Sequence, residues 1–90
     1  VHAESNSAYT LCGDRMDIKQ TRKYELLGLN VAYYRRRNKL TQEQLAELVG
    51  IDRTHMGNIE LARSGASLDV IFRIADALEI PVYKLFEFRD

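Results

Sequence analysis

The chain has 90 residues, and its 13 Lys and Arg residues balance 13 Asp and Glu residues, so the formal net charge at pH 7 is zero. Its 46% hydrophobic and 29% charged residues are typical of a folded protein and exclude a disordered one. We expect one small domain, no membrane-spanning segment and no signal peptide. The single cysteine, Cys12, cannot form an internal disulfide, which agrees with a reducing cytosol.

The neutral total conceals an uneven distribution of charge. Residues 1–40 contain eight basic and four acidic side chains, a net charge of +4, whereas residues 41–90 contain five basic and nine acidic ones, a net charge of −4. Half of the basic residues of the first part lie between Arg35 and Lys39. Such a run can follow phosphates or can be the solvated end of a helix, where the helix dipole favours cations. Neutral net charge therefore does not exclude nucleic acid as a partner, but it lowers the expected non-specific affinity.

Residues 1–19 show no sustained hydrophobic period, so we predict a flexible tail there and a folded domain over residues 20–90. A first helix is predicted from about Thr21 to Arg37–Lys39. Its apolar positions are spaced by three or four residues and are Tyr24, Leu27, Val31 and Tyr34.

The second helix has clear start and stop signals. Thr41 and Gln44 form a capping box, which predicts a helix that begins at Gln42. The helix is predicted to end at Gly50, because glycine best adopts the left-handed conformation at a helix end.

A third helix follows almost immediately. Only Ile51 separates Gly50 from Asp52, which is a good N-cap for a helix from Arg53 to about Leu61. The two helices are thus joined by a very tight turn.

The remaining chain predicts two more helices after a loop over residues 62–66. Ser67 caps the first of them, Pro81 interrupts it, and Val82 to Phe86 forms a last short helix. The apolar stripe of the Ser67-capped helix is predicted to be Leu68, Ile71, Ile74, Ala75 and Leu78. Across the chain we expect a core of Leu45, Ala46, Leu48, Val49, Met56, Ile59, Ile71, Ile74, Leu78 and Leu85. The fold class is therefore all-α, with five helices and no convincing strand.

A helix, a three-residue turn with glycine and a second helix form the helix-turn-helix motif, whose second helix enters the DNA major groove. The run from Leu40 to Glu60 closely resembles the Cro/C1-type helix-turn-helix family, also called the xenobiotic response element family, and the resemblance extends over about residues 24–86. It implies a compact five-helix, lambda-repressor-like DNA-binding domain whose motif is formed by helices 2 and 3. Asp52-Arg53-Thr54 followed by Ile59-Glu60 is similar to small regulators that include restriction-modification controller proteins.

The resemblance implies base-reading residues at the start of the third helix. Arg53 matches a position that can bridge guanine O6 and N7, and Thr54 can contact a thymine methyl group or a phosphate. Asn58 lies on the same helix face and suits adenine, while His55 can touch a base edge or a phosphate. The alternative for these residues is a solvated helix tip. Gly57 either permits close approach to DNA or is simply tolerated.

The same resemblance implies a set of DNA-backbone contacts, which are Gln42, Arg63, Ser64, Arg36, Arg37 and Lys39. Gln42 is otherwise a good polar residue with which to begin a helix, and the basic run is otherwise a solvated helix end. Near Arg63 the sequence departs from the family pattern, because Ala62 replaces a usual glycine and Ala66 a usual proline.

Two further features are structural or oligomeric. Arg35 and Glu60 match the family's interhelical ion pair, which removes Arg35 from the probable DNA contacts. Tyr83, Phe86 and Phe88 give the acidic C-terminal segment more aromatic surface than a small core needs, so we expect a dimer interface there.

We therefore expect a sequence-specific double-stranded DNA-binding transcriptional regulator that acts as a homodimer on an inverted repeat in the cytoplasm. The alternative is an antitoxin or a coactivator-like interaction module with the same fold. An enzyme is not expected, because no Gly-rich phosphate loop, HExxH or CxxC motif is present. With His2 and His55 far apart in sequence, no metal site is expected, and no cofactor or small-molecule substrate is evident.

Overall fold

The computed structural model describes residues 17–88, and within this range all regular secondary structure is helical, without a strand. In chain order its elements are η1 (Ile18–Gln20), α2 (Thr21–Arg37), α3 (Gln42–Val49), α4 (Arg53–Glu60), α5 (Leu68–Leu78) and η2 (Val82–Phe86). The predicted all-α class is confirmed.

Two boundaries differ from the prediction. The fifth predicted helix, η2, is a 3-10 helix: Lys84 N donates to Pro81 O at 3.0 Å, and a five-residue segment is short enough for this tighter winding. Residues 18 and 19, assigned to the tail, form with Gln20 a 3-10 helix that is capped by Asp17, while residues 1–16, with Cys12, lie outside the described residues.

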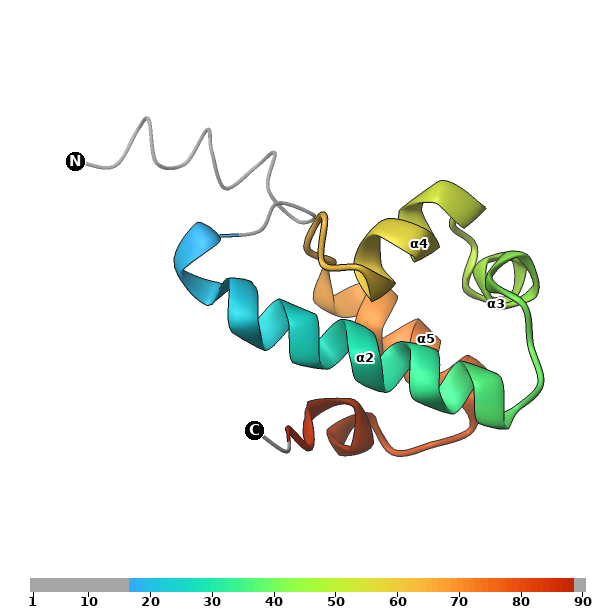
Figure 1. Ribbon diagram of the computed structural model, residues 1–90. Coiled ribbons are helices and arrows are strands. Elements are labelled where there is room, and N and C mark those ends of the chain that lie inside the picture. Colours follow the sequence, from blue (N-terminus) through green and yellow to red (C-terminus); the bar gives the residue numbers. More distant parts are fainter. Residues whose placement is uncertain (1–16, 89–90) are drawn as a thin grey trace.

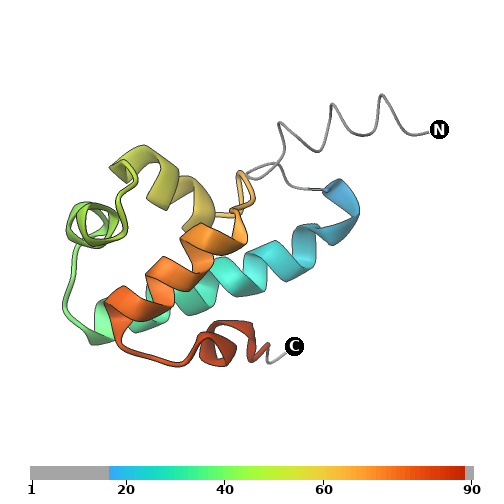
Figure 2. The ribbon, with the colours of Figure 1, turned by 180° about the vertical axis from the view of Figure 1, so that it is seen from behind.

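The longest helix, α2, organises the molecule. The ribbon shows α4 on one side of α2 and η2 on the other, and α5 crosses behind α2 in one view and in front of it in the opposite view (Figures 1 and 2). The short helices α3 and α4 pack on each other, and α3 also packs on α5. Within residues 17–88 no helix combines the length and the apolar character required to cross a bilayer.

The core lies where these helices meet. Its buried side chains are Leu27, Val31, Leu45, Ala46, Val49, Met56, Ile59, Val70, Ile71, Ile74, Ala75, Leu78 and Leu85. Two predicted apolar positions are wrong, because Leu48 is 62% exposed and Leu68 is 64% exposed. At 3.6 residues per turn, each lies about 100° around its helix from the centre of the buried stripe. Val70 is buried on α5 instead of Leu68.

The predicted helix ends are confirmed by their hydrogen bonds. In the capping box, Gln44 N donates to Thr41 Oγ1 at 3.0 Å, and Thr41 N donates to Gln44 Oε1 at 2.8 Å. Ser67 Oγ accepts from Val70 N at 3.3 Å at the start of α5. These side chains satisfy backbone N–H groups that a helix leaves without intrahelical partners.

A contact between distant parts of the chain closes the other end of α3. Arg73, on α5, donates from Nη1 to Val49 O at 2.9 Å and from Nε to Asp69 O at 3.4 Å. The guanidinium thus satisfies a carbonyl at the C-terminal end of α3, where a cation is also favoured by the helix dipole. The end of α3 is thereby tied to α5.

Candidate nucleic-acid interface

The turn between α3 and α4 contains three residues and is built as the sequence predicts. Gly50 has φ 88°, in the left-handed region, and its N–H donates to Ala46 O at 2.8 Å. Asp52 then caps α4, since its Oδ1 accepts from His55 N at 2.7 Å. The two helices therefore form a helix-turn-helix motif, and α4 begins at Arg53.

The first turn of α4 presents polar side chains to solvent. Arg53 and Thr54 are exposed, and Asn58, one helical turn beyond Thr54, is half-buried. His55 is half-buried and its Nε2 atom is buried. From Arg53 to Asn58 the helix contains no acidic residue. Three of the four predicted base-reading residues thus lie in the first turn of α4, and Asn58 lies one turn further on.

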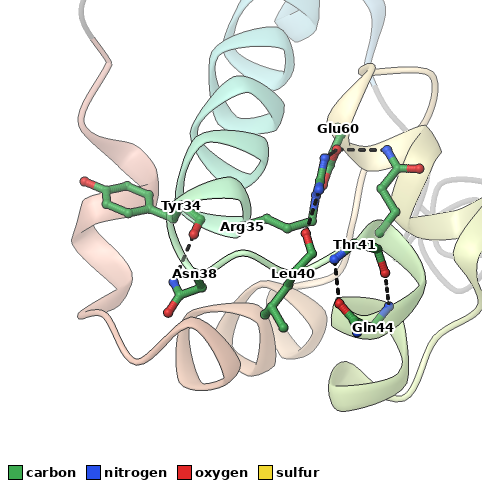
Figure 3. A network of polar contacts seen from close by, with 8 residues as sticks. Tyr34, Arg35, Asn38, Leu40, Thr41, Gln44 and Glu60 are labelled. Atoms are coloured by element: carbon green, nitrogen blue, oxygen red, sulfur yellow. Dashed lines mark hydrogen bonds and ion pairs between the residues drawn. The ribbon is translucent and has the colours of Figure 1, made fainter.

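The last turn of α4 is held against α2 by an ion pair, as the sequence predicts. Arg35 Nε lies 2.7 Å from Glu60 Oε2, and Arg35 Nη2 donates to Glu60 Oε1 at 3.1 Å (Figure 3). The two side chains are only 11% and 4% exposed. Arg35 Nη1 also donates to Leu40 O at 2.8 Å, so one guanidinium links α2, the end of α4 and the segment that leads into α3.

Close approach of α2 and α4 depends on Gly28, whose role the sequence analysis missed. A Cβ atom at this position would lie 2.5 Å from Glu60 O and 2.6 Å from Ile59 O. Both atoms are backbone, so the helices would have to move apart to admit even an alanine. The available signal was a glycine within the apolar stripe of the first helix, between Leu27 and Val31.

Gln42, a predicted phosphate contact, has a partner that the sequence analysis did not foresee. Its Nε2 donates to Glu60 Oε1 at 2.9 Å, and the residue is half-buried at the start of α3. A Cβ on Gly57 would lie 3.6 Å from Gln42 Oε1 and 3.9 Å from Nε2, which is ordinary contact. Gly57 therefore faces the Gln42 amide.

The loop after α4 places Arg63 in solvent but turns Ser64 inward. Arg63 is exposed, whereas the Ser64 hydroxyl is buried and makes no hydrogen bond within the described structure. Ala62 adopts φ 58° in the left-handed region, which explains why glycine is usual in its place. A contact from Ser64 to a phosphate thus requires its side chain to turn outward.

The basic run at the end of α2 is divided between two surroundings. Arg36 and Arg37 line a groove between α2 and the C-terminal segment, together with Tyr33, Lys84 and Phe88, whereas Lys39 is exposed in the next loop with φ 60°.

Within this groove, Arg37 Nη1 donates to Tyr33 Oη at 3.1 Å. This hydrogen bond raises the pKa of the Arg37 guanidinium. The groove lies on the side of α2 that faces η2, away from α4 (Figure 1). Arg36 and Arg37 are thus set apart from the tip of α4.

The predicted dimer-interface aromatics are partly accessible. Tyr83 is 58% exposed and Phe86 is 43% exposed, whereas Phe88 is half-buried and packs against the core. Asn30 Nδ2, on α2, fixes this segment by donating to Leu85 O at 2.9 Å and to Glu87 O at 3.3 Å.

Two exposed apolar side chains of α2, Leu29 and Tyr33, were not among the predicted interface residues. Both line the groove beside the C-terminal segment. The apolar surface on this side of the molecule is thus larger than the C-terminal aromatics alone.

Comparison with known proteins identifies matches over most of the chain. The model of the helix-turn-helix family matches residues 31–85. Control protein C.SmaI from Serratia marcescens is 43% identical over 70 residues, which are 78% of this chain and 77% of that protein.

Solved structures agree in fold. The crystal structure of the restriction-modification controller protein C.AhdI from Aeromonas hydrophila has a TM-score of 0.69 and 35% identity, and the match covers 70% of this chain and 96% of that one. For the hypothetical transcription factor NHTF from Neisseria, the TM-score is 0.71 with 30% identity, covering 73% of this chain and 76% of that one. The residues matched by the family model include all of α3, the turn and α4.

Proposed function

Because this chain belongs to the Cro/C1-type helix-turn-helix family of DNA-binding regulators, we propose that it regulates transcription by binding a specific double-stranded DNA sequence. One observation carries this proposal: beyond a three-residue turn, α4 exposes Arg53 and Thr54 at its N-terminal end, and after the capping Asp52 no acidic residue follows before Glu60. The likeness to C.SmaI and C.AhdI supports a role in the control of a restriction-modification system. Such a regulator works in the cytoplasm, where the DNA is.

Sequence preference is assigned to the first turns of α4, inserted in the major groove. Arg53 has donors suited to guanine O6 and N7, and Asn58 has an amide suited to adenine N6 and N7. Thr54 contacts a thymine methyl group or a phosphate, and His55 contacts a base edge or a phosphate next to them. All four residues lie on a single helix, three in its first turn and Asn58 one turn further on, which suits contacts with neighbouring base pairs.

Affinity is assigned to contacts with the DNA backbone. Gln42 and Arg63 flank the base-reading residues in the chain, and Ser64 contributes once its hydroxyl turns outward. Lys39 is the exposed cation of the α2–α3 loop, whereas Arg36 and Arg37 add mainly long-range attraction because they face the groove beside η2.

The working form is a homodimer on an inverted repeat. Exposed Tyr83 and Phe86, with Phe88 beside them, supply apolar surface that a second copy can cover. A two-fold axis would set two recognition helices one DNA turn apart, about 34 Å.

Selection of bound duplexes from a random pool tests binding, half-site spacing and symmetry at once. We expect enrichment of an inverted repeat whose half-sites are about 10 base pairs apart, centre to centre. Enrichment of a single half-site would contradict the dimer alone. Failure to enrich any sequence, together with binding that does not depend on salt, would contradict the regulator itself.

A second candidate function is an interaction module, such as an antitoxin or a coactivator-like adaptor. The observation in its favour is the exposure of large apolar side chains on two neighbouring elements, Leu29 and Tyr33 on α2 and Tyr83 and Phe86 on η2. A monomer that binds no duplex but co-purifies with a protein partner would favour this function. Loss of that partner on substitution of Tyr83 would locate the contact.

A further inference from the structure

We propose that Glu60 is a positioning residue for DNA binding, because its carboxylate fixes the Gln42 amide in the orientation that offers an N–H to a phosphate. The inference rests on the proposed phosphate contact of Gln42. It gives the Arg35–Glu60 ion pair a second role beside that of joining α2 to α4.

The geometry around the carboxylate determines which end of the Gln42 amide faces inward. Glu60 Oε1 accepts from both Arg35 Nη2, at 3.1 Å, and Gln42 Nε2, at 2.9 Å. An ionised carboxylate can only accept hydrogen bonds, so it selects the amide nitrogen of Gln42 and excludes the amide oxygen. One N–H of the planar amide is used in this way, and the other is left for an anion.

The charge and burial of Glu60 suit this indirect role. Its side chain is 4% exposed, so it does not reach DNA itself. Arg35 compensates its negative charge with two hydrogen bonds, which keeps that charge from repelling a nearby phosphate. The carboxylate therefore acts on the backbone contact only through Gln42.

Gly57 provides the space in which the Gln42 amide lies. A Cβ there would be in ordinary contact with both amide heavy atoms, at 3.6 and 3.9 Å, so a side chain longer than alanine would compete for the same place. The amide is thus bounded by Gly57 on α4 and by the Glu60 carboxylate. This contact accounts for a small residue at position 57 without direct approach to DNA.

Without the carboxylate, the amide is free to turn and to present its oxygen to the phosphate, which repels it. Loss of the Glu60 charge should therefore weaken binding to all duplexes, and only while Gln42 is present. A Glu60 that serves the fold alone would produce the same change in affinity with or without Gln42.

A double-mutant cycle separates these two cases. Affinity is measured for wild type, Gln42→Ala, Glu60→Gln and the double variant, on a duplex recovered by selection and on an unrelated duplex of equal length. Circular dichroism establishes that each variant is folded at the assay temperature. Glu43→Gln is the matched control, because it removes an exposed charge next to Gln42.

We expect Gln42→Ala and Glu60→Gln each to weaken binding to both duplexes by about tenfold, and the double variant to be no weaker than Gln42→Ala. Glu43→Gln should have the same effect in both backgrounds. Equal losses from Glu60→Gln with and without Gln42 would overturn the positioning role and leave the proposed function intact. An unchanged affinity in Gln42→Ala would overturn the phosphate contact and this inference together. A wild-type protein that binds neither duplex would overturn both the inference and the proposed function.

A measurement on the wild-type protein keeps the inference testable if Glu60→Gln does not fold. The side-chain amide protons of Gln42 are assigned in NMR spectra by their loss in Gln42→Ala. We expect the proton that Gln42 donates to Glu60 to exchange with water at least about tenfold more slowly than the side-chain amide protons of the exposed Gln44. Equal exchange at the two glutamines would overturn the inference.

Discussion

At its first turn α4 exposes Arg53 and Thr54, whereas at its last turn it buries Glu60 beneath Arg35 and beside Gln42. Within one helix of eight residues, a solvated tip is thus followed by a buried carboxylate that accepts three hydrogen bonds. The C-terminal end of α4, held by Glu60, fixes the direction of the helix, whereas its exposed N-terminal tip is free to contact a ligand. Substitutions should therefore divide into those that change the stability of the fold and those that change DNA recognition.

The largest effect is expected at the fixed end. Glu60→Ala leaves the Arg35 guanidinium almost buried and without its counter-charge, so the free energy of unfolding should fall by about 3–5 kcal/mol. Urea denaturation followed by circular dichroism measures this loss. Glu47→Ala, on the exposed face of α3, should change stability by less than about 0.5 kcal/mol. A similar loss in both variants would show that the ion pair contributes no more to the free energy of unfolding than an exposed glutamate does.

The next effect concerns the packing of α4 against α2. Gly28→Ala sets a Cβ against two backbone carbonyl groups and forces the helices apart, at a cost of about 1–3 kcal/mol in the free energy of unfolding. Thermal unfolding at several urea concentrations would quantify it. Stability equal to that of wild type would mean that the two helices are less closely packed than the structure indicates.

At the tip, Arg53→Ala should alter recognition and leave stability unchanged. We expect a loss of about 1–3 kcal/mol of discrimination at one base pair, since a bidentate contact to guanine is removed. Competition binding against duplexes substituted at each position would locate that base pair. An equal loss of affinity on every duplex would assign Arg53 to the backbone instead.

Beyond the last turn of α4, Arg63→Ala should weaken all duplexes alike. Removal of one phosphate contact lowers the slope of log affinity against log salt by about one. Titrations at several salt concentrations provide the slope for wild type and variant. A change in preference between duplexes would instead place Arg63 at a base edge.

The smallest expected effect lies midway between the two ends, and it has the opposite sign. Gly57→Ala should raise the free energy of unfolding by up to about 1 kcal/mol, because alanine is the better helix former and its Cβ meets only ordinary contacts. Chemical denaturation measures the gain. A stabilised variant with unchanged DNA affinity would exclude Gly57 as a point of direct DNA approach. A destabilised variant would show that the Gln42 amide cannot move aside for the added methyl group.

Much of the fold was predictable because its signals are local. Thr41 with Gln44, Gly50 and Asp52 act within a few residues of their own positions, so the caps and the turn follow from sequence spacing. Leu48 and Leu68 were misplaced for the same reason, since spacing within a short helix does not determine which side faces the rest of the molecule.

For the candidate site, the residue types were predictable and their mutual contacts were not. Arg53, Thr54 and Asn58 follow one another on a single helix, which the sequence can indicate. The bond from Gln42 to Glu60 joins residues 18 positions apart, and that from Arg73 to Val49 joins residues 24 apart. Such contacts depend on how α3, α4 and α5 are packed, and no local pattern specifies that packing.

The bond between Arg73 and Val49 limits how far the helix-turn-helix can be treated as a portable module. An α3–α4 pair transferred to another scaffold would lose two contacts. One is the hydrogen bond from Arg73 on α5 to the last residue of α3, and the other is the surface of α2 on which α4 packs. Grafting of a new specificity should therefore exchange only the side chains of the tip. The smallest transferable unit of this protein extends from α2 through η2, whose Leu85 completes the core, so its recognition surface is inherited as a whole domain.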